Sequence, residues 1–249
     1  MKKYNPPSTK SRNWIYGLHS AAAALKNPKR KIIRAYVTDK SLLGKLQADN
    51  PLLTLELADN QFFQKNFPGV THQGIALETL PLPQPTYNQL DLSSKNGLVL
   101  LLDQISDPHN IGAIIRSAAA FNATAVIAPE HNSPSENSTI TKVAAGAFEL
   151  VPYIQLSNLK LAIDHLKNNG YWIIGMDGTA HASLHQLTNY DKVAILMGAE
   201  DKGIRPSLLP YCDLLAKITM YGSTESLNVS NAAAIAMYQF STISKGNSE

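Results

Sequence analysis

Six short apolar runs in the second half of the chain restrict the possible fold more than any other feature. Their Val, Ile and Leu residues follow one another without the polar alternation of half-exposed strands, and helix-length segments lie between them. Such strands are buried on both faces, as in a parallel sheet covered by helices. The runs are LVLLLD (98–103), TAVIAPE (124–130), LVPYIQL (150–156), GYWIIGMD (170–177), KVAILMG (192–198) and LLAKITM (214–220). The sequence therefore predicts an α/β fold with a parallel sheet, and helices over 110–122, 139–149, 157–169 and 229–243.

The first part of the chain alternates between helical and strand-like patterns and predicts a small α/β unit over residues 1–80, with a basic tail at 1–13. The successive segments are GLHSAAAALKN (17–27), KIIRAYVT (31–38), SLLGKLQADN (41–50), LLTLELA (52–58), DNQFFQKNF (59–67) and GIALETL (74–80). Pro81, Pro83 and Pro85 then occupy alternate positions, which favours an extended, semi-rigid spacer. We therefore expect a linker at 81–97 and a second domain at 98–245.

Positive charge is concentrated at the start of the chain, although the formal net charge of all 249 residues is only +3. Residues 1–40 hold ten Lys or Arg residues and one acidic residue, whereas the rest of the chain holds twelve basic and eighteen acidic residues. Clustered cations bind phosphate backbones because binding releases counterions. The first part is therefore expected to bind a polyanion, and a solvated tail that aids solubility is the alternative.

Several classes of protein are disfavoured by what the sequence contains. Its one cysteine, Cys212, allows no internal disulfide and fits a reducing compartment, so we expect the cytoplasm. The longest continuous apolar run, LVLLL, is too short to cross a bilayer, so no membrane is expected. The phosphate-binding patterns of nicotinamide enzymes and P-loop kinases are absent. His181 and His185 are four residues apart, but they lack the accompanying carboxylate motif or cysteine of a metal site, so we expect no metal.

Two of the predicted strands are followed by loops with unusual polar residues, at the sheet edge where ligands of parallel sheets bind. After LVLLLD, Asn110 stands at the expected N-cap of a helix and Arg116 follows six residues later. After KVAILM, Gly198 and Gly203 flank Glu200, so a carboxylate can be held close to a bound molecule. An ordinary capped helix with one exposed Arg, and a plain surface turn, are the alternatives for these loops.

A third loop, STESLNVS at 223–230, is more polar than a turn requires. Ser226, Asn228 and Ser230 can each cap the helix that is expected to end near Ile243. One cap needs only one of these side chains. The excess of polar groups therefore predicts a bound ligand.

Three motifs together resemble those of the SpoU family of RNA ribose 2′-O-methyltransferases, in the same order and at similar separations. They are NIGAIIR (110–116), MGAEDKG (197–203) and SLNVS (226–230), and the resemblance covers residues 98–243. GLHSAAAAL (17–25) and THQGIAL (71–77) resemble the ribosomal-protein-like RNA-binding domain of the bacterial 23S rRNA guanosine 2′-O-methyltransferase subgroup. The resemblance implies S-adenosylmethionine as methyl donor, a homodimer, and a trefoil knot at the C-terminal end of the catalytic domain.

The resemblance also nominates site residues by motif position. For the cofactor they are Met176, Asp177, Gly198, Ile218 and Leu227. For catalysis and the substrate side they are Asn110, Arg116, Glu200, Ser226 and Asn228. For RNA binding, the distribution of charge and not motif position indicates the densest basic patch, which is Lys29, Arg30, Lys31 and Arg34. The chain departs from the family pattern at Asp201, where glycine is usual, and at Thr219, where proline is usual.

The expected chemistry is transfer of a methyl group to a ribose 2′-oxygen of a guanosine in 23S rRNA. Because a guanidinium stays protonated at neutral pH, we expect Arg116 to grip a phosphate and stabilise the developing alkoxide. Glu200 is expected to orient Arg116 or the RNA, or to accept the hydroxyl proton directly or through water, and Asn228 to hold ribose or base. The alternatives are the same chemistry on tRNA or another rRNA site, and a non-catalytic RNA-binding or ribosome-assembly protein.

Overall fold

The computed structural model describes residues 12–243, which form two compact units. Unit 1 contains the described residues up to Pro83 together with Glu136–Glu149. Unit 2 contains Gln84–Ser135 and the described residues from Leu150 onward. The segment 136–149 lies in the sequence range expected for the second domain, but it clusters with unit 1.

Unit 1 has a four-stranded sheet with the order β1-β4-β2-β3, in which only the β2-β3 pair is parallel. Its elements are β1 (Asn13–Tyr16), α1 (Leu18–Lys26), β2 (Ile32–Val37), α2 (Lys40–Asp49), β3 (Leu55–Leu57), α3 (Asn60–Asn66) and β4 (Ile75–Thr79). Aspartates begin two of the helices: Asp39 accepts hydrogen bonds from backbone amides of α2, and Asp59 accepts one from α3. The structure adds β1 to the elements that the sequence predicted.

The segment Glu136–Glu149 completes unit 1. Its helix α5 (Ser138–Val143) packs against β1, and its short 3-10 helix η3 (Ala147–Glu149) packs against α1. Ser20 on α1 donates a hydrogen bond from Oγ to the carbonyl oxygen of Thr141, at 3.1 Å. Gly146 has φ +92° and lies so close to α1 that an added Cβ would come within 2.9 Å of the Ala23 side chain. This turn divides the single helix that the sequence predicted over 139–149.

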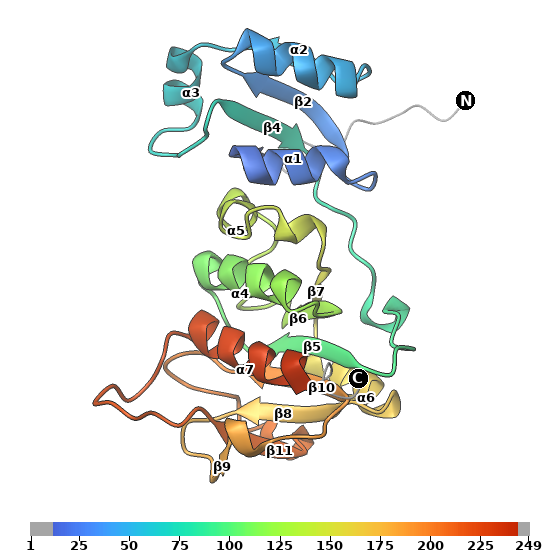
Figure 1. Ribbon diagram of the computed structural model, residues 1–249, viewed down its shortest axis with the longest axis vertical. Helices are drawn as coiled ribbons and strands as arrows, with labels where there is room; N and C mark the ends of the chain where they lie inside the picture. Colours follow the sequence, from blue (N-terminus) through green and yellow to red (C-terminus); the bar gives the residue numbers. More distant parts are fainter. Residues whose placement is uncertain (1–11, 244–249) are drawn as a thin grey trace. The chain divides into compact units, whose positions relative to one another are not determined.

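Unit 2 is built on a seven-stranded sheet with the order β7-β6-β5-β10-β8-β11-β9, in which every neighbouring pair is parallel (Figure 1). Its strands are β5 (Gly97–Leu102), β6 (Ala125–Pro129), β7 (Tyr153–Leu156), β8 (Trp172–Met176), β9 (Ala182–Ser183), β10 (Lys192–Met197) and β11 (Leu214–Lys217). Six of these strands coincide with the six apolar runs, which confirms the parallel α/β sheet. The two-residue strand β9 is an addition.

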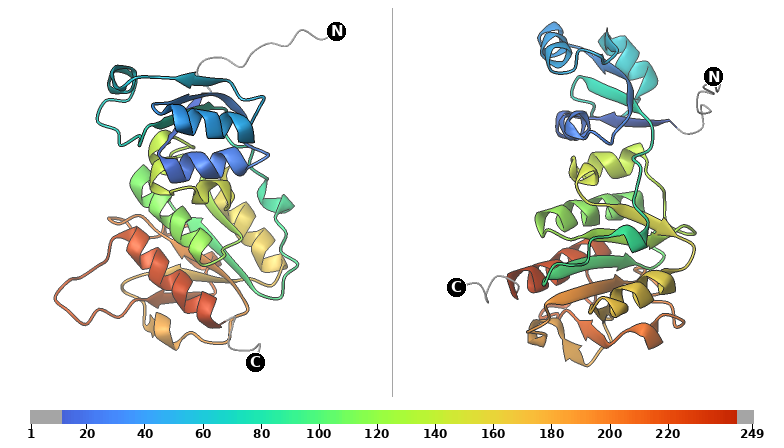
Figure 2. Two further views of the ribbon diagram at one scale, coloured as in Figure 1. Left: turned by 45° about the horizontal axis from the view of Figure 1, so that its top comes forward. Right: turned by 90° about the vertical axis from the view of Figure 1, so that its right-hand side faces the viewer.

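Helices cover both faces of this sheet, as the sequence predicted. Helices α4 (Pro108–Ala120) and α7 (Val229–Ile243) pack against each other on one face, and α6 (Leu159–Asn168) lies on the other (Figure 2). Val99 and Leu101 point from β5 into the core beneath α6 and are both fully buried. None of the helices that residues 12–243 form has the length and apolar character needed to span a membrane.

The predicted spacer at 81–97 is only partly a spacer. Its second half contains the 3-10 helix η2 (Tyr87–Gln89), and Tyr87, Leu90 and Leu92 pack against the α6 side of the unit 2 core. Leu92 is buried. Apolar side chains therefore attach this half of the segment to unit 2, and the boundary between the units falls at Pro83.

Candidate active site

The strand order of unit 2 brings the three polar loops to one edge of the sheet. Strand β10 lies between β5 and β8, and β8 pairs with β11 on its other side. Because all of these strands are parallel, the loops after β5, β10 and β11 leave the same edge. Residues more than a hundred positions apart in the sequence meet there.

Asn110, Glu200 and Asn228 are joined by hydrogen bonds. Asn228 donates from Nδ2 to Glu200 Oε1 at 2.7 Å and to Asn110 Oδ1 at 2.9 Å. Asn110 Nδ2 lies 3.4 Å from the same Glu200 oxygen. The backbone amide of Val229, the first residue of α7, also donates to Glu200 Oε1, at 3.1 Å. One carboxylate oxygen therefore ties together the loop after β10, the start of α4 and the start of α7.

Asn228 also begins the last helix. Its Oδ1 accepts hydrogen bonds from the backbone amide and the hydroxyl group of Ser230, at 2.9 and 2.6 Å. This is an N-cap arrangement, and the Glu200 carboxylate beside it is further favoured by the positive end of the α7 dipole. Both ends of the Asn228 amide are thus occupied by protein groups. The amide that was expected to hold ribose or base organises Glu200 and α7 in this structure.

Asn110 does not cap α4, contrary to the expectation from the sequence. The N-cap is Asp107, whose side chain accepts a hydrogen bond from the His109 amide, and Pro108 occupies the first turn. This places Asn110 inside the first turn, where its side chain is free to reach Glu200. The signal was available, since aspartate followed by proline is typical of a helix start.

A cavity of about 360 Å³ opens beside Glu200 at the carboxyl ends of β8, β10 and β11. Its size is in the range of small-molecule sites, which is roughly 300 to 1,000 Å³. All five residues predicted to bind the cofactor line it: Met176, Asp177, Gly198, Ile218 and Leu227. Ser226 lines it as well. Charged residues that were not predicted also contribute to its wall, namely Lys202, Lys217 and Glu225, and they follow or precede predicted residues in the same loops.

The glycines of the second loop shape this wall. Ala199 and Gly203 exchange two backbone hydrogen bonds of 3.2 and 2.8 Å, so residues 198–203 form a tight hairpin with Glu200 near its tip. A Cβ added to Gly198 would stand 2.1 Å from the carbonyl carbon of Gly203. Gly203 has φ +64°, in the left-handed region that favours glycine. Close approach of two chain segments, and not only contact with a ligand, therefore requires glycine at position 198.

A second cavity of about 240 Å³ also borders Glu200. Asn110, Asp107 and Gln104 line it together with Asp201, one of the two departures from the family pattern. The two cavities share Ala199, Glu200 and Val229. Glu200 therefore borders both cavities.

Two further positions that the sequence singled out are Arg116 and Thr219. Arg116 is exposed on α4, lines neither cavity, and makes no hydrogen bond or ion pair with the residues that the structure describes. It therefore does not join the Asn110–Glu200–Asn228 cluster. Thr219, the second departure, is hydrogen-bonded through Oγ1 to Ser183 Oγ at 2.6 Å. This bond attaches the loop after β11 to β9 and gives the hydroxyl a structural role.

The predicted basic patch of unit 1 is exposed except at Arg30. Lys29 and Lys31 are exposed, and Arg34 is 42% exposed and paired with Glu56 at 3.0 Å. The Arg30 side chain has no exposure, so the prediction that it contacts RNA is wrong for this structure.

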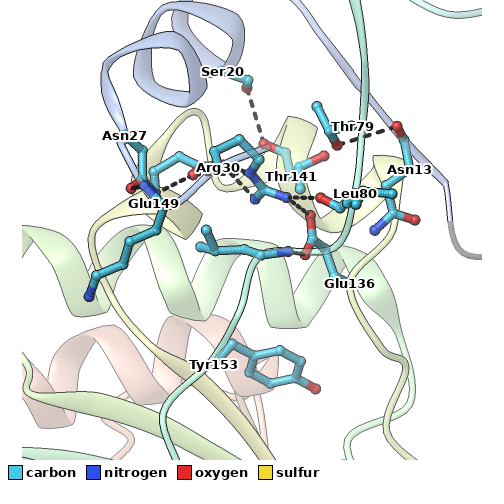
Figure 3. A network of polar contacts seen from close by, with 12 residues as sticks. Asn13, Ser20, Asn27, Arg30, Thr79, Leu80, Glu136, Thr141, Glu149 and Tyr153 are labelled. Atoms are coloured by element: carbon cyan, nitrogen blue, oxygen red, sulfur yellow. Dashed lines mark hydrogen bonds and ion pairs between the residues drawn. The ribbon is translucent and has the colours of Figure 1, made fainter. Parts of the chain in front are cut away.

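The reason for the burial of Arg30 is its pairing with two carboxylates of the 136–149 segment. Its guanidinium lies 2.5 Å from Glu136 Oε1 and 2.6 Å from Glu149 Oε1, and it donates a further hydrogen bond to the Leu80 carbonyl oxygen at 3.1 Å (Figure 3). Glu149 also accepts a hydrogen bond from Asn27, and Glu136 one from the Leu82 amide. Buried charges of this kind are retained only when paired and hydrogen-bonded. Arg30 therefore holds the 136–149 segment in unit 1.

Comparison with known proteins identifies the family. The sequence model described as the SpoU rRNA Methylase family matches residues 97–238. The chain belongs to this SpoU family. A second model, described as RNA 2′-O ribose methyltransferase substrate binding, matches residues 14–85. The cavity and the Glu200 cluster lie within the SpoU match, and the Arg30 network joins the substrate-binding match to residues 136–149 of the SpoU match.

Named relatives of this SpoU chain cover nearly its whole length. It is 37% identical over 240 residues to the 23S rRNA (guanosine-2′-O-)-methyltransferase RlmB of Vibrio vulnificus, with 92% of this chain and 96% of that protein aligned. Against RlmB of Escherichia coli strain K12 the identity is 37% over 233 residues, with 90% and 96% aligned.

Among solved structures, the SpoU methyltransferase AviRb from Streptomyces viridochromogenes in complex with AdoMet has the same fold, with a TM-score of 0.81 at 18% identity over 94% of this chain and 90% of that one. The AdoMet-bound rRNA methyltransferase from Sinorhizobium meliloti gives 0.81 at 19% identity, over 92% and 87%.

Proposed function

We propose that this protein transfers a methyl group from S-adenosylmethionine to the ribose 2′-oxygen of a guanosine in 23S rRNA. The relatives that cover almost all of the chain are named for this reaction. The observation in this chain that carries the proposal is the position of Glu200, which lines both cavities and binds Asn110 and Asn228. Methyl transfer requires the ribose 2′-oxygen to face the methyl carbon in line with the sulfur, and a carboxylate at the border of both cavities can reach the hydroxyl proton from the side.

The residues of the larger cavity suit S-adenosylmethionine. Met176, Ile218 and Leu227 offer apolar surface for an adenine ring, and Asp177 and Glu225 offer carboxylates for the cationic part of the molecule. The bound cofactor supplies a methyl group that is already activated by a positively charged sulfur. The protein then has to exclude water, orient the ribose hydroxyl group and accept its proton.

We assign the proton to Glu200, either directly or through one water molecule. Its Oε1 is fixed by Asn228 and Val229, whereas its Oε2 has no hydrogen-bond partner among the described residues. The bonds to Oε1 hold the carboxylate in one orientation, so the second oxygen is left to act. Asn110, which is hydrogen-bonded to Glu200, and Ser226, which lines the larger cavity, are further polar groups for the ribose or the cofactor.

We assign Arg116 to a phosphate of the RNA. It is a permanently charged group on the exposed face of α4, six residues or about 9 Å along the helix from Asn110. The planar guanidinium can bind a phosphate with two parallel hydrogen bonds and stabilise negative charge that develops nearby. Its exposure and its freedom from other described residues support this assignment.

Selection of the RNA is assigned to unit 1. Lys29 and Lys31 provide exposed positive charge, with Arg34 beside them, and the match to a substrate-binding family supports the assignment. The functional division that we propose is a substrate-binding domain at 1–80, a linker at 81–97 and a methyltransferase domain at 98–245; residues 1–11 of the expected basic tail at 1–13 lie outside the described residues. In the folded chain, residues 136–149 are added to the first of these.

We propose three further properties: a trefoil knot, a homodimer and action in the cytoplasm. A trefoil knot is proposed from the resemblance of the three motifs to those of the SpoU family. A homodimer is supported by α7, whose Ile235 and Tyr238 remain 42% and 60% exposed. Action in the cytoplasm follows from the proposed substrate and fits the single cysteine. Light scattering measures the dimer directly.

The decisive experiment is incubation of the protein with radiolabelled S-adenosylmethionine and separate samples of 23S rRNA, 16S rRNA and tRNA. Mapping of the labelled ribose in 23S rRNA should find a single 2′-O-methylguanosine. Label in tRNA or 16S rRNA alone would assign the same chemistry to another substrate. Cofactor binding without label in any RNA, including unmodified transcripts, would favour the alternative of a non-catalytic RNA-binding or ribosome-assembly protein.

A further inference from the structure

Asp103 is a fully buried carboxylate at the end of β5 that the proposed chemistry does not use. Its Oδ1 accepts a hydrogen bond from Arg205 Nε at 2.7 Å, and its Oδ2 accepts one from the Arg205 backbone amide at 2.9 Å. The Arg205 side chain is 40% exposed. A buried carboxylate is tolerated only when it is paired and hydrogen-bonded, and removal of one partner of such a pair destabilises the fold.

The partner of Asp103 stands where the hairpin of the active site ends. Residues 198–203 form that hairpin, and Arg205 follows it after one residue. On the other side, the backbone amide of Asp103 donates to the carbonyl oxygen of Met197, the last residue before the hairpin, at 2.7 Å. Asp103 is therefore bonded to the chain on entry to the hairpin and on exit from it.

We infer that Asp103 is a positioning residue for methyl transfer: through Arg205 it sets the orientation of the 198–203 hairpin and thereby the position of Glu200. This inference rests on the proposed function of the hairpin. The hairpin also forms a wall of the larger cavity, where Gly198, Gly203 and Ile204 line the space. Without the contact to Arg205 the exit of the hairpin loses an anchor, and displacement of a reacting group by about 1 Å can lower a rate 100-fold.

Asp213 offers a control in the same unit with the same kinds of partner, at a side chain that is 27% exposed where that of Asp103 is buried. Its Oδ2 accepts a hydrogen bond from the Ile173 backbone amide at 2.8 Å, and its Oδ1 pairs with Lys167 Nζ at 2.7 Å. Each of the two aspartates thus holds one backbone amide and one cation. Asp213 immediately precedes β11, so it lies at the amino edge of the sheet, whereas Asp103 follows β5 at the carboxyl edge. General loss of stability should be common to both sites, and loss of positioning should not.

The test compares Asp103→Asn with Asp213→Asn in the full chain. Both variants should melt at a lower temperature. Only Asp103→Asn should weaken S-adenosylmethionine binding in calorimetry, by about 10-fold, and lower kcat for RNA methylation by at least about 10-fold. Equal effects of the two variants on cofactor binding and kcat would overturn the inference, and so would an Asp103→Asn variant with wild-type binding and kcat.

Arg205→Gln provides the same test if Asp103→Asn does not fold, because it leaves the backbone hydrogen bond and removes only a half-exposed side chain. We expect a smaller loss of cofactor affinity and kcat, partly restored in Arg205→Lys. A change confined to the KM for RNA would show that Arg205 contacts the RNA and would overturn the positioning role. Wild-type protein that binds the cofactor without methylating RNA would count against the proposed function, while the comparison of cofactor affinities would still decide the positioning role.

Discussion

Asn228 Nδ2 donates to Glu200 Oε1 across 2.7 Å, which joins the cap of the last helix to the tip of the hairpin after β10. The same oxygen receives the Val229 amide. The carboxylate thus stabilises the start of α7 and lines both cavities. An informative substitution at Glu200 therefore has to keep its hydrogen bonds to the start of α7 and alter only its ability to accept a proton.

Glu200→Gln meets this requirement. The amide oxygen of glutamine can still accept from Asn228 and Val229, but the charge and the second acceptor are lost. We expect methylation to fall by about 100-fold or more, with cofactor affinity within about threefold of wild type. Single-turnover kinetics and calorimetry measure the two quantities. Asp164→Asn, which removes an exposed carboxylate from α6, should change neither. Full activity of Glu200→Gln would show that this carboxylate does not accept the proton.

Arg116→Lys keeps the positive charge and removes the planar fork. Because Arg116 is exposed and unpaired within the described residues, its replacement should leave the melting temperature unchanged. We expect methylation to fall by roughly 100-fold, since a guanidinium that binds a phosphate through two bonds is not replaced by a point charge. Methylation at close to the wild-type rate would exclude the bidentate role.

Gly198→Ala should deform the cofactor cavity. The new methyl group would stand 2.1 Å from the Gly203 carbonyl carbon, a backbone atom that can move only with the hairpin. We expect at least about a 10-fold loss of S-adenosylmethionine affinity. Gly44→Ala is the control: nothing lies within 4 Å of its added Cβ, and it should stabilise α2 by roughly 0.5 to 1 kcal/mol with cofactor affinity unchanged. If Gly198→Ala binds the cofactor normally, the hairpin is not held by this contact.

Arg30→Met should destabilise unit 1. The substitution leaves the carboxylates of Glu136 and Glu149 buried without their cation, which costs about 3 to 5 kcal/mol. Urea unfolding measures the loss. Lys29→Met is the matched control, because Lys29 is exposed: it should leave stability unchanged and weaken RNA binding with a smaller dependence on salt. An Arg30→Met protein with wild-type stability would show that the pairing contributes nothing.

Burial raises the pKa of the Cys212 thiol to about 11 from 9.0, and the neighbouring Asp213 carboxylate adds to the rise. The reactive thiolate is therefore about 100-fold scarcer than for the unperturbed thiol at about pH 8. Alkylation of the folded protein by iodoacetamide should be slow and should still accelerate above pH 9.0. Mass spectrometry at several pH values checks this, with urea-unfolded protein as the control. Rapid labelling of the folded protein near neutral pH would contradict it.

Much of unit 2 could be predicted from the sequence because its strands are apolar on both faces. Local composition is enough to locate such strands, and their separation by helices implies parallel pairing. The two-residue strand β9 and the four-residue strand β1 could not be found in this way, since runs of that length have no recognisable period. The cavity residues were placed by resemblance to a family. The pattern of the chain alone indicated only that the loops were too polar.

The contacts that could not be predicted from the sequence join residues that lie far apart in the chain. In the sequence Arg30 is one of several neighbouring cations, and its partners Glu136 and Glu149 lie 106 and 119 residues away. Likewise, the contact of Asp103 with Arg205 spans 102 residues. Charge counting assumes that cations near each other in sequence share a surface. That assumption fails where folding buries one of them against acids from a distant segment.

The composition of unit 1 has a consequence for protein engineering. Unit 1 is formed by two separate segments of the chain. The second segment, residues 136–149, comes from the middle of the SpoU match and is held by the ion pairs of Arg30. A chimera in which only the residues before Pro83 are replaced by those of another enzyme would lose Arg30. The buried carboxylates of Glu136 and Glu149 would then have no cation to pair with. Grafting the foreign module together with its own counterpart of 136–149 would keep that junction intact.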